Sequence, residues 1–453
     1  MSFNSMIAMF HVDMLSIIMI SLVSFIGIVV CFFSSRYMKG DALYRQFFIH
    51  ILILLIAVML ITIADNLMLF LSAWCCCNLI LARLMVHKST WKAAKASGRL
   101  ASRNFMLGFS FMILAFAILY KATGSLSIQY IVHNSNDYWA TLMALILLLM
   151  GAMTQSAIWP FHRWLISSLN SPTPISALMH AGIVNGGGFL LARFAPLYFS
   201  VPKTLNIIFI VGLTGALLGS LWKLMQHDVK RMLACSTMGQ MGFMFVQFGL
   251  GFFASGLAHL FCHGLFKAYL FLASGSAAQE KRLDLGYPPD LISFLCALAC
   301  GALGSYIFAI INHKHWLRLD TSLIMIGIVF IAGAQLALTV LRAASVKKFL
   351  LAMITTAAMA TLYGANVYFF DLILSPLALI QPQPLTILHV IALIMLSLSW
   401  LFILFFKSSK NKDDLSNWFI GPYVKALNSS QPHPDTITSY RKEYEYVSGK
   451  IHG

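Results

Sequence analysis

Long apolar stretches separated by short polar connections run through nearly the whole chain. A helix needs about 20 predominantly apolar residues to cross the hydrocarbon core of a bilayer, and thirteen stretches are close to that length. Their predicted positions are 12–33, 47–63, 67–86, 105–120, 139–159, 173–195, 205–224, 231–250, 252–278, 291–311, 321–341, 349–372 and 386–406. The pattern predicts an all-α polytopic membrane protein with about thirteen transmembrane helices.

The composition leads to the same class of protein. Hydrophobic residues make up 59% of the 453 residues and charged residues only 10%, whereas ordinary soluble domains are about 25% charged. A soluble fold of this length could not cover so much apolar surface with polar groups. No small-residue cleavage site follows the first apolar stretch, so we expect a retained helix there and not a removed signal peptide.

The chain carries 31 Lys and Arg against 15 Asp and Glu, a formal net charge of +16. These basic residues lie between the apolar stretches and not on an amphipathic soluble surface, so we expect no nucleic-acid partner. If the helices alternate in direction, one side collects Arg36, Lys39, Arg45, Arg83, Lys88, Lys92, Lys95, Arg99, Arg103, Arg163, Lys223, Lys230, Arg231, Lys281, Arg282, Arg342, Lys347 and Lys348. The other side has mainly Lys121, Lys203, Lys314 and Arg318. The positive-inside rule then predicts a periplasmic N-terminus and a cytoplasmic C-terminus.

All eight cysteines lie inside apolar stretches, and no pair has the spacing of a zinc finger or a haem attachment site. Cysteine packs as a small apolar residue in such surroundings, so we expect neither a metal site nor a disulfide. The sequence also contains no glycine-rich phosphate loop. We therefore expect no cofactor in this chain and no catalysis by it, so that chemistry on a soluble substrate would belong to a partner.

The ninth apolar stretch contains three ionisable residues, His259, His263 and Lys267. Steps of four residues place all three on one face of a helix, and ionisable groups at bilayer depth are costly enough to indicate a function. Histidine changes charge near neutral pH, so the three side chains could relay protons through intervening water. In the structural alternative, each histidine only hydrogen-bonds a backbone carbonyl.

A second unusual region has Pro160 shortly after Gln155, and then Pro172 and Pro174 ahead of His180. Prolines so close together break a helix and free backbone polar groups, which a membrane tolerates only where protein or water satisfies them. Transporters form binding sites at such interruptions. We therefore predict a broken helix here, with His180 inside the following span; an ordinary helix end would explain Pro160 alone.

A third region is the polar connection 226–231, which leads into a span whose first turns carry Ser236 and Thr237. Lys230 in this connection could belong to an ion path. The structural alternative makes Asp228 the N-cap of the helix and the basic residues an anchor of the membrane topology.

Four stretches together resemble a known family, the large proton-conducting membrane subunits of NADH:quinone oxidoreductase (complex I) and of multisubunit (Mrp) cation/proton antiporters. They are 160–165 (PFHRWL), 171–181 (SPTPISALMHA), 228–243 (DVKRMLACSTMGQMGF) and 263–272 (HGLFKAYLFL), in the order and spacing of the family. The resemblance implies antiporter-like inverted repeats of five helices with broken helices, and a polar axis along the membrane midplane. We accordingly divide the chain into N-terminal helices (1–64), an antiporter-like core (65–286), C-terminal helices (287–406) and a cytoplasmic tail (407–453).

Two departures from the family pattern concern the ion path. The family has a glutamate directly after the tryptophan of an early polar helix, where Trp74 is followed here by Cys75, and the partner lysine falls at Gln155. The resemblance assigns the proton pathway to His180, Lys230, His259, His263, Lys267 and Gln155. By the predicted positions no acid lies deep in the membrane, and a dehydrated sodium ion prefers carboxylate oxygens. Protons are therefore favoured over sodium.

Within that family, residues 180–197 and 240–244 and the short length are most similar to the membrane subunits of DAB inorganic carbon transporters. This resemblance implies a bacterial inner-membrane complex that accumulates CO2 or bicarbonate. Protons flowing down the proton-motive force would drive a DabA-like, carbonic-anhydrase-related partner, which would hold zinc. The alternatives are a proton-pumping subunit of a complex I or hydrogenase-type complex, a sodium/proton antiporter subunit, and a scaffold whose proton path has decayed.

Overall fold

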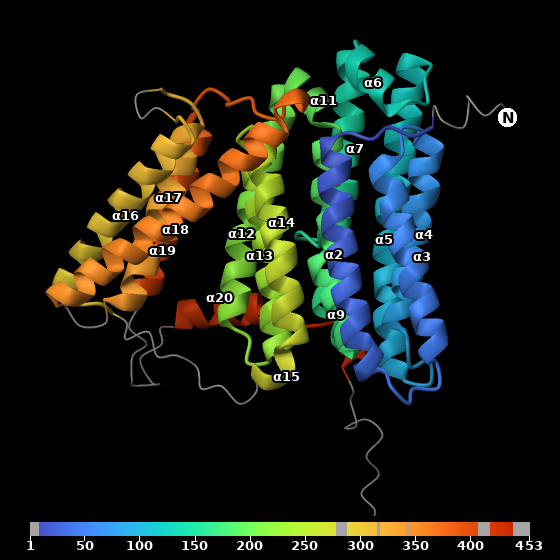
Figure 1. The fold of residues 1–453 in the computed structure, drawn as a ribbon, viewed down its shortest axis with the longest axis horizontal. Coiled ribbons are helices and arrows are strands. Elements are labelled where there is room, and N and C mark those ends of the chain that lie inside the picture. Colours follow the sequence, from blue (N-terminus) through green and yellow to red (C-terminus); the bar gives the residue numbers. More distant parts are fainter. Residues whose placement is uncertain (1–8, 278–287, 315–317, 342–344, 406–416, 438–453) are drawn as a thin grey trace, which may run out of the picture.

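The computed structural model describes residues 9–277, 288–314, 318–341, 345–405 and 417–437. Within these ranges the chain is helical, with only isolated β-bridges between connections, and long helices run side by side (Figure 1). The predicted all-α class is confirmed. Of the predicted tail 407–453, only residues 417–437 belong to the described part, and the predicted topology residues Lys281, Arg282 and Arg342 lie outside it.

The N-terminal helices are α2 (Met14–Tyr37), α3 (Tyr44–Ile63), α4 (Leu67–Met85), α5 (Lys92–Thr123), α6 (Ile128–Asn134) and α7 (Tyr138–Gln155). Short polar side chains begin several of them by accepting a backbone N–H of the first turn. Asp13 caps α2, Asn66 caps α4, Ser127 caps α6 and Asp137 caps α7. Each cap satisfies a donor that the helix leaves free, and so fixes where the helix begins.

The middle of the chain has shorter elements. They are α8 (Arg163–Ile166), the 3-10 turn η1 (Ser168–Asn170), α9 (Thr173–Ala181), the 3-10 turn η2 (Ile183–Asn185), α10 (Gly186–Arg193) and α11 (Ala195–Ser200). Long helices return with α12 (Pro202–Leu224), α13 (Val229–Gly249) and α14 (Phe253–Leu272), and α15 (Ser274–Ala277) follows. Residues 173–193 form one span by length, interrupted by η2 near its middle.

The C-terminal helices are α16 (Leu291–Ile311), α17 (Ser322–Val340), α18 (Val346–Ile373), the 3-10 turn η3 (Ser375–Leu377) and α19 (Ile387–Phe405). The tail contributes α20 (Asn417–Ser429) and the 3-10 turn η5 (Pro434–Thr436). Each of the four long helices runs without interruption between its bounds. The interruptions of the described chain that concern the site are therefore those around α8, α9 and α10.

Eleven helical segments of the described chain are long and apolar enough to cross a membrane. All thirteen predicted stretches contain a helix, but α13 and α14 are not among the eleven. The count of about thirteen spans is therefore not confirmed. These two helices carry Lys230, Thr237, His259, His263 and Lys267, and such side chains lower the hydropathy on which a span is recognised.

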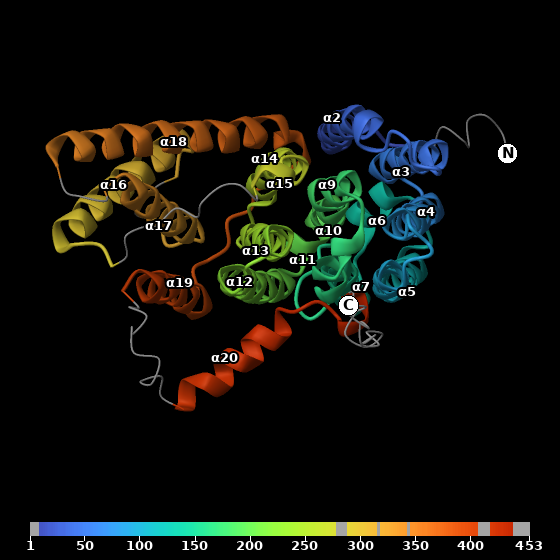
Figure 2. The same cartoon turned by 90° about the horizontal axis from the view of Figure 1, so that it is seen from below.

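Helices α2 to α14 form a bundle with α9 and α10 at its centre (Figure 2). One hydrophobic cluster joins these helices. Glycines let α12 and α13 approach closely: a Cβ on Gly219 would collide with the backbone of Gly239, and one on Gly242 with the backbone of Ala216. Close contact through small residues is a usual way of packing membrane helices. It gives α13, which contributes to the site, a fixed support.

The helix ends define two faces. Connections such as 38–43 and 225–228 lie at the end that we call the basic face, because most of the Lys and Arg residues of the connections gather there (Figure 1). Connections such as 64–66 and 374–386 lie at the other end, the opposite face. The chain therefore alternates between the two faces as the positions of the basic residues predict.

Helices α16 to α19 stand beside the bundle as a second group (Figure 2). Near the opposite face the two groups share a hydrophobic cluster, in which Phe209 and Phe252 belong to the bundle and Ile324 and Met325 to α17. Toward the basic face the two groups diverge (Figure 1). This divergence leaves space between α12, α13, α17 and α19, and that space is part of the site described below.

The tail returns to the basic face of the bundle. The Gln226 side-chain amide donates to the Ser430 hydroxyl at 2.9 Å, and both residues are buried. The His433 backbone N–H donates to the Ser167 hydroxyl at 2.9 Å. These bonds attach residues 430–436 to the α12–α13 connection and to the residue that follows α8.

A buried ion pair joins the N-cap residue of α2 to the end of the interrupted span. The Arg193 guanidinium, at the end of α10, binds the Asp13 carboxylate and donates to the Thr62 carbonyl oxygen at 2.8 Å. It also lies over the Phe189 ring, 5.2 Å from the ring centroid. Burial alone would raise the pKa of Asp13, but the Arg193 charge and the Ser16 N–H outweigh it, so that the pKa lies below its ordinary value. The carboxylate is therefore held ionised against its partner.

Candidate functional site

Helix α14 carries three ionisable side chains along one face. The His259 and His263 rings are stacked, with centroids 6.2 Å apart and planes inclined by 21°. Both ring nitrogens of His263 are buried, and neither has a hydrogen-bond partner among the described residues. The Lys267 side chain is 1% exposed, and its Nζ donates to the Leu233 carbonyl oxygen of α13 at 2.9 Å. The spacing of four residues thus places these groups in file within the bundle.

His180 of α9 joins this file through α13. Its Nδ1 lies 3.2 Å from the Thr237 hydroxyl, and that hydroxyl donates to the Leu233 carbonyl oxygen at 3.0 Å. Because Lys267 donates to the same carbonyl, His180 and Lys267 are connected through one hydroxyl and one backbone oxygen. The His180 ring also stacks on Phe271, with centroids 4.2 Å apart. Hydrogen bonds across α9, α13 and α14 therefore link two titratable side chains, His180 and Lys267.

Lys230 lies nearer the basic face, in the first turn of α13. Its Nζ donates to the Thr173 hydroxyl at 3.2 Å. Thr173 begins α9, and seven residues separate it from His180, so the two side chains lie on the same face of that helix. Lys230 is therefore placed at the approach to His180 from the basic face, while Asp228 caps α13 through the Arg231 N–H. A place for Lys230 in an ion path and the N-cap role of Asp228 are therefore compatible with each other.

The predicted proline breaks lie at helix ends. Pro160 lies in the connection between α7 and α8, Pro172 is the N-cap residue of α9, and Pro174 is in the first turn of α9. The interruption inside the span 173–193 lies further on, at η2. Proline lacks a backbone donor and suits a first helical turn, which explains why Pro172 and Pro174 mark a start and not the interruption.

Gln155 fills the interruption from the side of α7. Its side-chain amide donates to the Ile183 carbonyl oxygen at 3.3 Å, and the neighbouring Ser156 hydroxyl donates to the Val184 carbonyl oxygen at 2.8 Å. Both acceptors lie in η2, whose residues leave carbonyls outside a regular helix. A break inside a membrane span needs such partners. Gln155 thus satisfies the backbone of the break.

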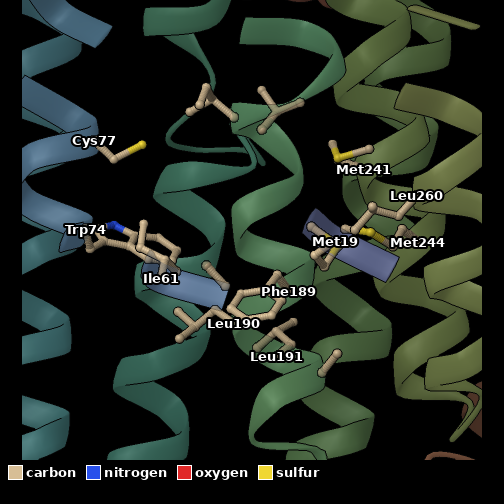
Figure 3. Packing of buried hydrophobic residues seen from close by; sticks show 14 of the residues in the cluster. Met19, Ile61, Trp74, Cys77, Phe189, Leu190, Leu191, Met241, Met244 and Leu260 are labelled. Carbon is tan, nitrogen blue, oxygen red and sulfur yellow. The ribbon is translucent and has the colours of Figure 1, made fainter. Parts of the chain in front are cut away.

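The structure places Gln155 apart from the histidines. A cavity of about 30 Å³ on this side is lined by Trp74, Cys77, Asn78, Gln155 and residues from α2, α3, η2 and α10, and none of its lining residues is a histidine or a lysine. Figure 3 shows Trp74 and Cys77 on one side of α10, and Met241, Met244 and Leu260 on the other. We call these two sides the α4 flank and the α14 flank.

The α14 flank opens on two larger cavities. The first, of about 510 Å³, lies between α12, α13, α17 and α19 and reaches from Lys223 and Ser236 to His259. The second, of about 330 Å³, lies between α13, α14, α16, α17 and α18. His259 and Phe243 line both cavities. The second group of helices thus supplies the far wall of a space that leads from the basic face to the file of histidines.

Sequence reasoning did not assign roles to several of these residues. The sequence identified Thr237 only as a polar side chain in a membrane helix. The structure shows that its hydroxyl bonds His180. Asn78, one turn after Trp74, is buried, and its Oδ1 has no partner among the described residues. A buried amide is costly unless it is bonded, and this signal could have been read from the sequence. In the described chain no group of three or more His, Cys, Asp or Glu residues could hold a metal ion.

Family models match two parts of the chain. The model described as NADH:quinone oxidoreductase/Mrp antiporter, transmembrane, matches residues 64–285. The model described as NADH-ubiquinone oxidoreductase (complex I), chain 5 N-terminus, matches residues 3–48. Together they cover more than half of the chain.

Named relatives fall into two groups. The probable inorganic carbon transporter subunit DabB1 of Halothiobacillus neapolitanus is 37% identical over 295 residues, which are 63% of this chain and 53% of the relative. The DabB counterpart of Bacillus subtilis is 33% identical over 311 residues, 68% of this chain and 60% of the relative. The chloroplastic NAD(P)H-quinone oxidoreductase subunit 5 of Brachypodium distachyon is 34% identical over 312 residues, 65% of this chain and 41% of the relative. The aligned part of the chain therefore spans only about half to three-fifths of the DabB relatives.

Two solved structures share the fold. The Mrp complex from a Dietzia species matches with a TM-score of 0.57 and 21% identity, over 93% of this chain and 45% of the matched chain. The archaeal membrane-bound sulfane sulfur reductase matches with a TM-score of 0.55 and 17% identity, over 92% of this chain and 81% of the matched chain. At these identities the likeness concerns the fold alone.

Proposed function

Because the chain belongs to the family of antiporter-like membrane subunits of complex I and Mrp complexes, we propose that it conducts protons as the membrane subunit of an inorganic carbon transporter. A carbonic-anhydrase-related zinc partner would hydrate CO2, and proton flow down the proton-motive force would favour bicarbonate formation. The relatives named as inorganic carbon transporter subunits support this assignment. We place the complex in a bacterial inner membrane, with the N-terminus periplasmic and the basic face cytoplasmic.

The observation that carries the proposal is the connection between His180 and Lys267. Thr237 and the Leu233 carbonyl oxygen link the two side chains across three helices. A buried lysine and a buried histidine both exist in two protonation states that are accessible without a metal or a cofactor. A proton can therefore be taken up, held and released inside the bundle.

The proton-motive force is large enough for this task. One elementary charge that crosses 100 mV gains about 2.3 kcal/mol. A tenfold bias in the equilibrium of the partner enzyme needs about 1.4 kcal/mol. One proton per cycle would therefore already bias CO2 hydration by more than tenfold toward bicarbonate.

The basic face is the proposed contact surface for the partner. It carries the connections rich in Lys and Arg, and the tail segment 430–436 is attached to it. The Gln226–Ser430 bond reaches the connection that leads into α13. A partner bound at the tail would therefore contact the helix that carries Thr237, which gives a physical route for coupling.

The experiment is a growth rescue. The chain and its large zinc partner are produced together in cells that lack carbonic anhydrase, and growth in ambient air is scored with and without an uncoupler. We expect growth to need both proteins and to disappear with the uncoupler. We also expect growth to fail for Lys267→Ala and for His180→Ala.

Lys203→Ala, at an exposed lysine outside the site, is the matched control and should grow as the parent does. Normal growth of both site variants would overturn the proposed path, even if the partnership stood. Failure of a well-produced parent pair to rescue growth would overturn the carbon-transport assignment.

The second candidate is a subunit of a respiratory complex, since some relatives are named NAD(P)H-quinone oxidoreductase subunits. Gene neighbours distinguish the two: a set of redox subunits favours the respiratory complex, and one large zinc protein favours carbon transport. Sodium-dependent transport by purified protein would point to a sodium/proton antiporter subunit.

A further inference from the structure

A group of polar side chains lies on the α14 flank beyond the residues assigned to the path. In the described chain the Gln247 Oε1, the Thr356 Oγ1 and the Asp371 Oδ1 are buried and have no hydrogen-bond partner. They belong to α13 and α18. Burying polar oxygens without partners is costly, so each of the three calls for a reason other than packing.

The cavity of about 330 Å³ lies between His259 and part of this group. His259 lines one part of the cavity, and Thr356 and Tyr363 of α18 line another. The Tyr363 hydroxyl accepts a hydrogen bond from the Gln247 side-chain amide at 3.4 Å. A buried water molecule needs room for about one probe sphere and two to four polar partners. The cavity has the room, but only His259, Thr356 and Tyr363 supply polar atoms in an otherwise apolar lining, so these three side chains are where bridging water would have to bind.

One more ionisable side chain of α18 lies beyond Tyr363, toward the opposite face. Asp371 lies eight residues after Tyr363, which is about 12 Å further along α18, and it is in the last turn of that helix. The Lys314 ammonium lies over the Phe252 ring, 4.2 Å from the centroid, and interacts electrostatically with Asp371 and Asp320. Asp371 also acts electrostatically on Tyr363. Lys314 is thus the charged side chain whose field acts on Asp371, and Tyr363 lies about two helical turns further inward.

We propose that Tyr363, Asp371 and Lys314 form the outer branch of the ion path, with the Asp371 carboxylate exchanging protons with water at the opposite face. The inference rests on the proposed proton conduction and names the residues that complete it. A carboxylate with one free buried oxygen can accept a proton there, and the charge of the Lys314 ammonium favours the release of that proton again. No bond other than that of the moving proton is made or broken.

The proposed branch also supplies an acid in place of the glutamate that the family has after Trp74. The family's early glutamate is replaced by Cys75, whereas Asp371 places a carboxyl group at the other end of the file. The chain would thus carry its acid on α18, about two turns beyond the Tyr363 that lines the second cavity, and not on α4. The position of Asp371 near the end of a predicted span gave no indication of this from the sequence.

Proton flux into liposomes that contain the purified full chain tests the branch. A potassium gradient with valinomycin sets the membrane potential, and a trapped pH dye reports the initial rate. We expect Asp371→Asn to lower the rate by at least about tenfold, as loss of a proton-exchanging group does, and Asp371→Glu to restore most of it. Lys267→Ala is measured in parallel, and Lys203→Ala serves as the control.

The two proposals fail in different ways. If Lys267→Ala blocks the flux while Asp371→Asn conducts as the parent does, the outer branch is wrong and the proposed conduction stands. If the parent itself does not conduct, or if Lys267→Ala conducts normally, the conduction and the branch that rests on it both fail. Loss of flux in both Asp371 variants with a lowered melting temperature would indicate a structural role and would also overturn the branch.

A second readout is independent of flux. Dicyclohexylcarbodiimide dissolves in the bilayer and modifies carboxyl groups that are protonated in apolar surroundings. Peptide mass spectrometry should find the modification at Asp371 and not at Asp137, whose side chain is exposed. No modification at Asp371 at pH 6 would contradict a carboxyl group that takes up protons.

Discussion

The two flanks of the interrupted helix contain polar groups of different kinds. On the α4 flank, Asn78 and Gln155 hold hydrogen-bonding groups that do not titrate near neutral pH, around a cavity of about 30 Å³. On the α14 flank, histidines and a lysine stand beside cavities of about 510 and 330 Å³. Proton transfer needs both groups that change protonation and room for water. The difference therefore favours the α14 flank for the proposed conduction, while the α4 flank supports the backbone of the break.

Lys267→Ala should have the largest effect on proton flux along the α14 flank. The variant removes the buried ammonium that donates to the Leu233 carbonyl oxygen, and general acid–base groups contribute about a hundredfold or more to proton transfer. We expect proton flux in liposomes to fall by about a hundredfold. Because Thr237 still bonds the same carbonyl, the melting temperature should change little. Flux within about threefold of the parent would show that the α14 flank does not conduct.

His263→Leu separates conduction from packing. The His263 nitrogens have no hydrogen-bond partner among the described residues, and replacing an unsatisfied buried polar group by an apolar one is nearly neutral or stabilising. We expect an unchanged or higher melting temperature together with a flux lowered by about ten- to a hundredfold. A large loss of stability would instead favour the structural interpretation of this histidine.

Thr237→Val should have a smaller effect. Valine keeps the shape of the side chain but removes the hydroxyl that links His180 to the Leu233 carbonyl oxygen. Water can partly replace that link, so we expect the flux to fall by about three- to tenfold. Thr214→Val is the matched control, because that hydroxyl is exposed and bonds only within its own helix. Equal effects of the two variants would count against the hydrogen-bonded chain.

Gln155→Leu should have the smallest effect on conduction. The substitution removes the bond to the Ile183 carbonyl oxygen, which is worth about 1 kcal/mol of stability. We expect a slightly lower melting temperature and a flux within about twofold of the parent. A tenfold loss of flux would mean that the α4 flank conducts and would reverse the comparison of the two flanks.

Much of the architecture could be predicted from the sequence, because apolar stretches of bilayer length determine where helices form. The spacing of His259, His263 and Lys267 also fixed their common face, since a helix repeats every 3.6 residues. The link through Thr237 and Leu233 could not be predicted, because it depends on how α13 packs against α9 and α14. The interruption at η2 was missed for a related reason: prolines mark the start of α9, whereas the break depends on partners from α7.

Asp371 shows another limit of sequence reasoning. Its position near the end of a predicted span placed it among the acids that do not lie deep in the membrane. The structure keeps it near the end of α18 but buries one carboxylate oxygen, and α18 packs against α14 and α16. Depth in a bundle is set by neighbouring helices and cannot be read from distance along one helix alone.

The Arg193–Asp13 pair bears on biogenesis. A lone arginine at the end of an inserting helix disfavours insertion by a few kcal/mol, and Asp13 relieves that cost from a helix made much earlier. We therefore expect the translocon to retain α2 near the exit site until α10 emerges. Insertion of α10 would then depend on the earlier synthesis of α2. A chain that began after α2 would insert its later helices poorly.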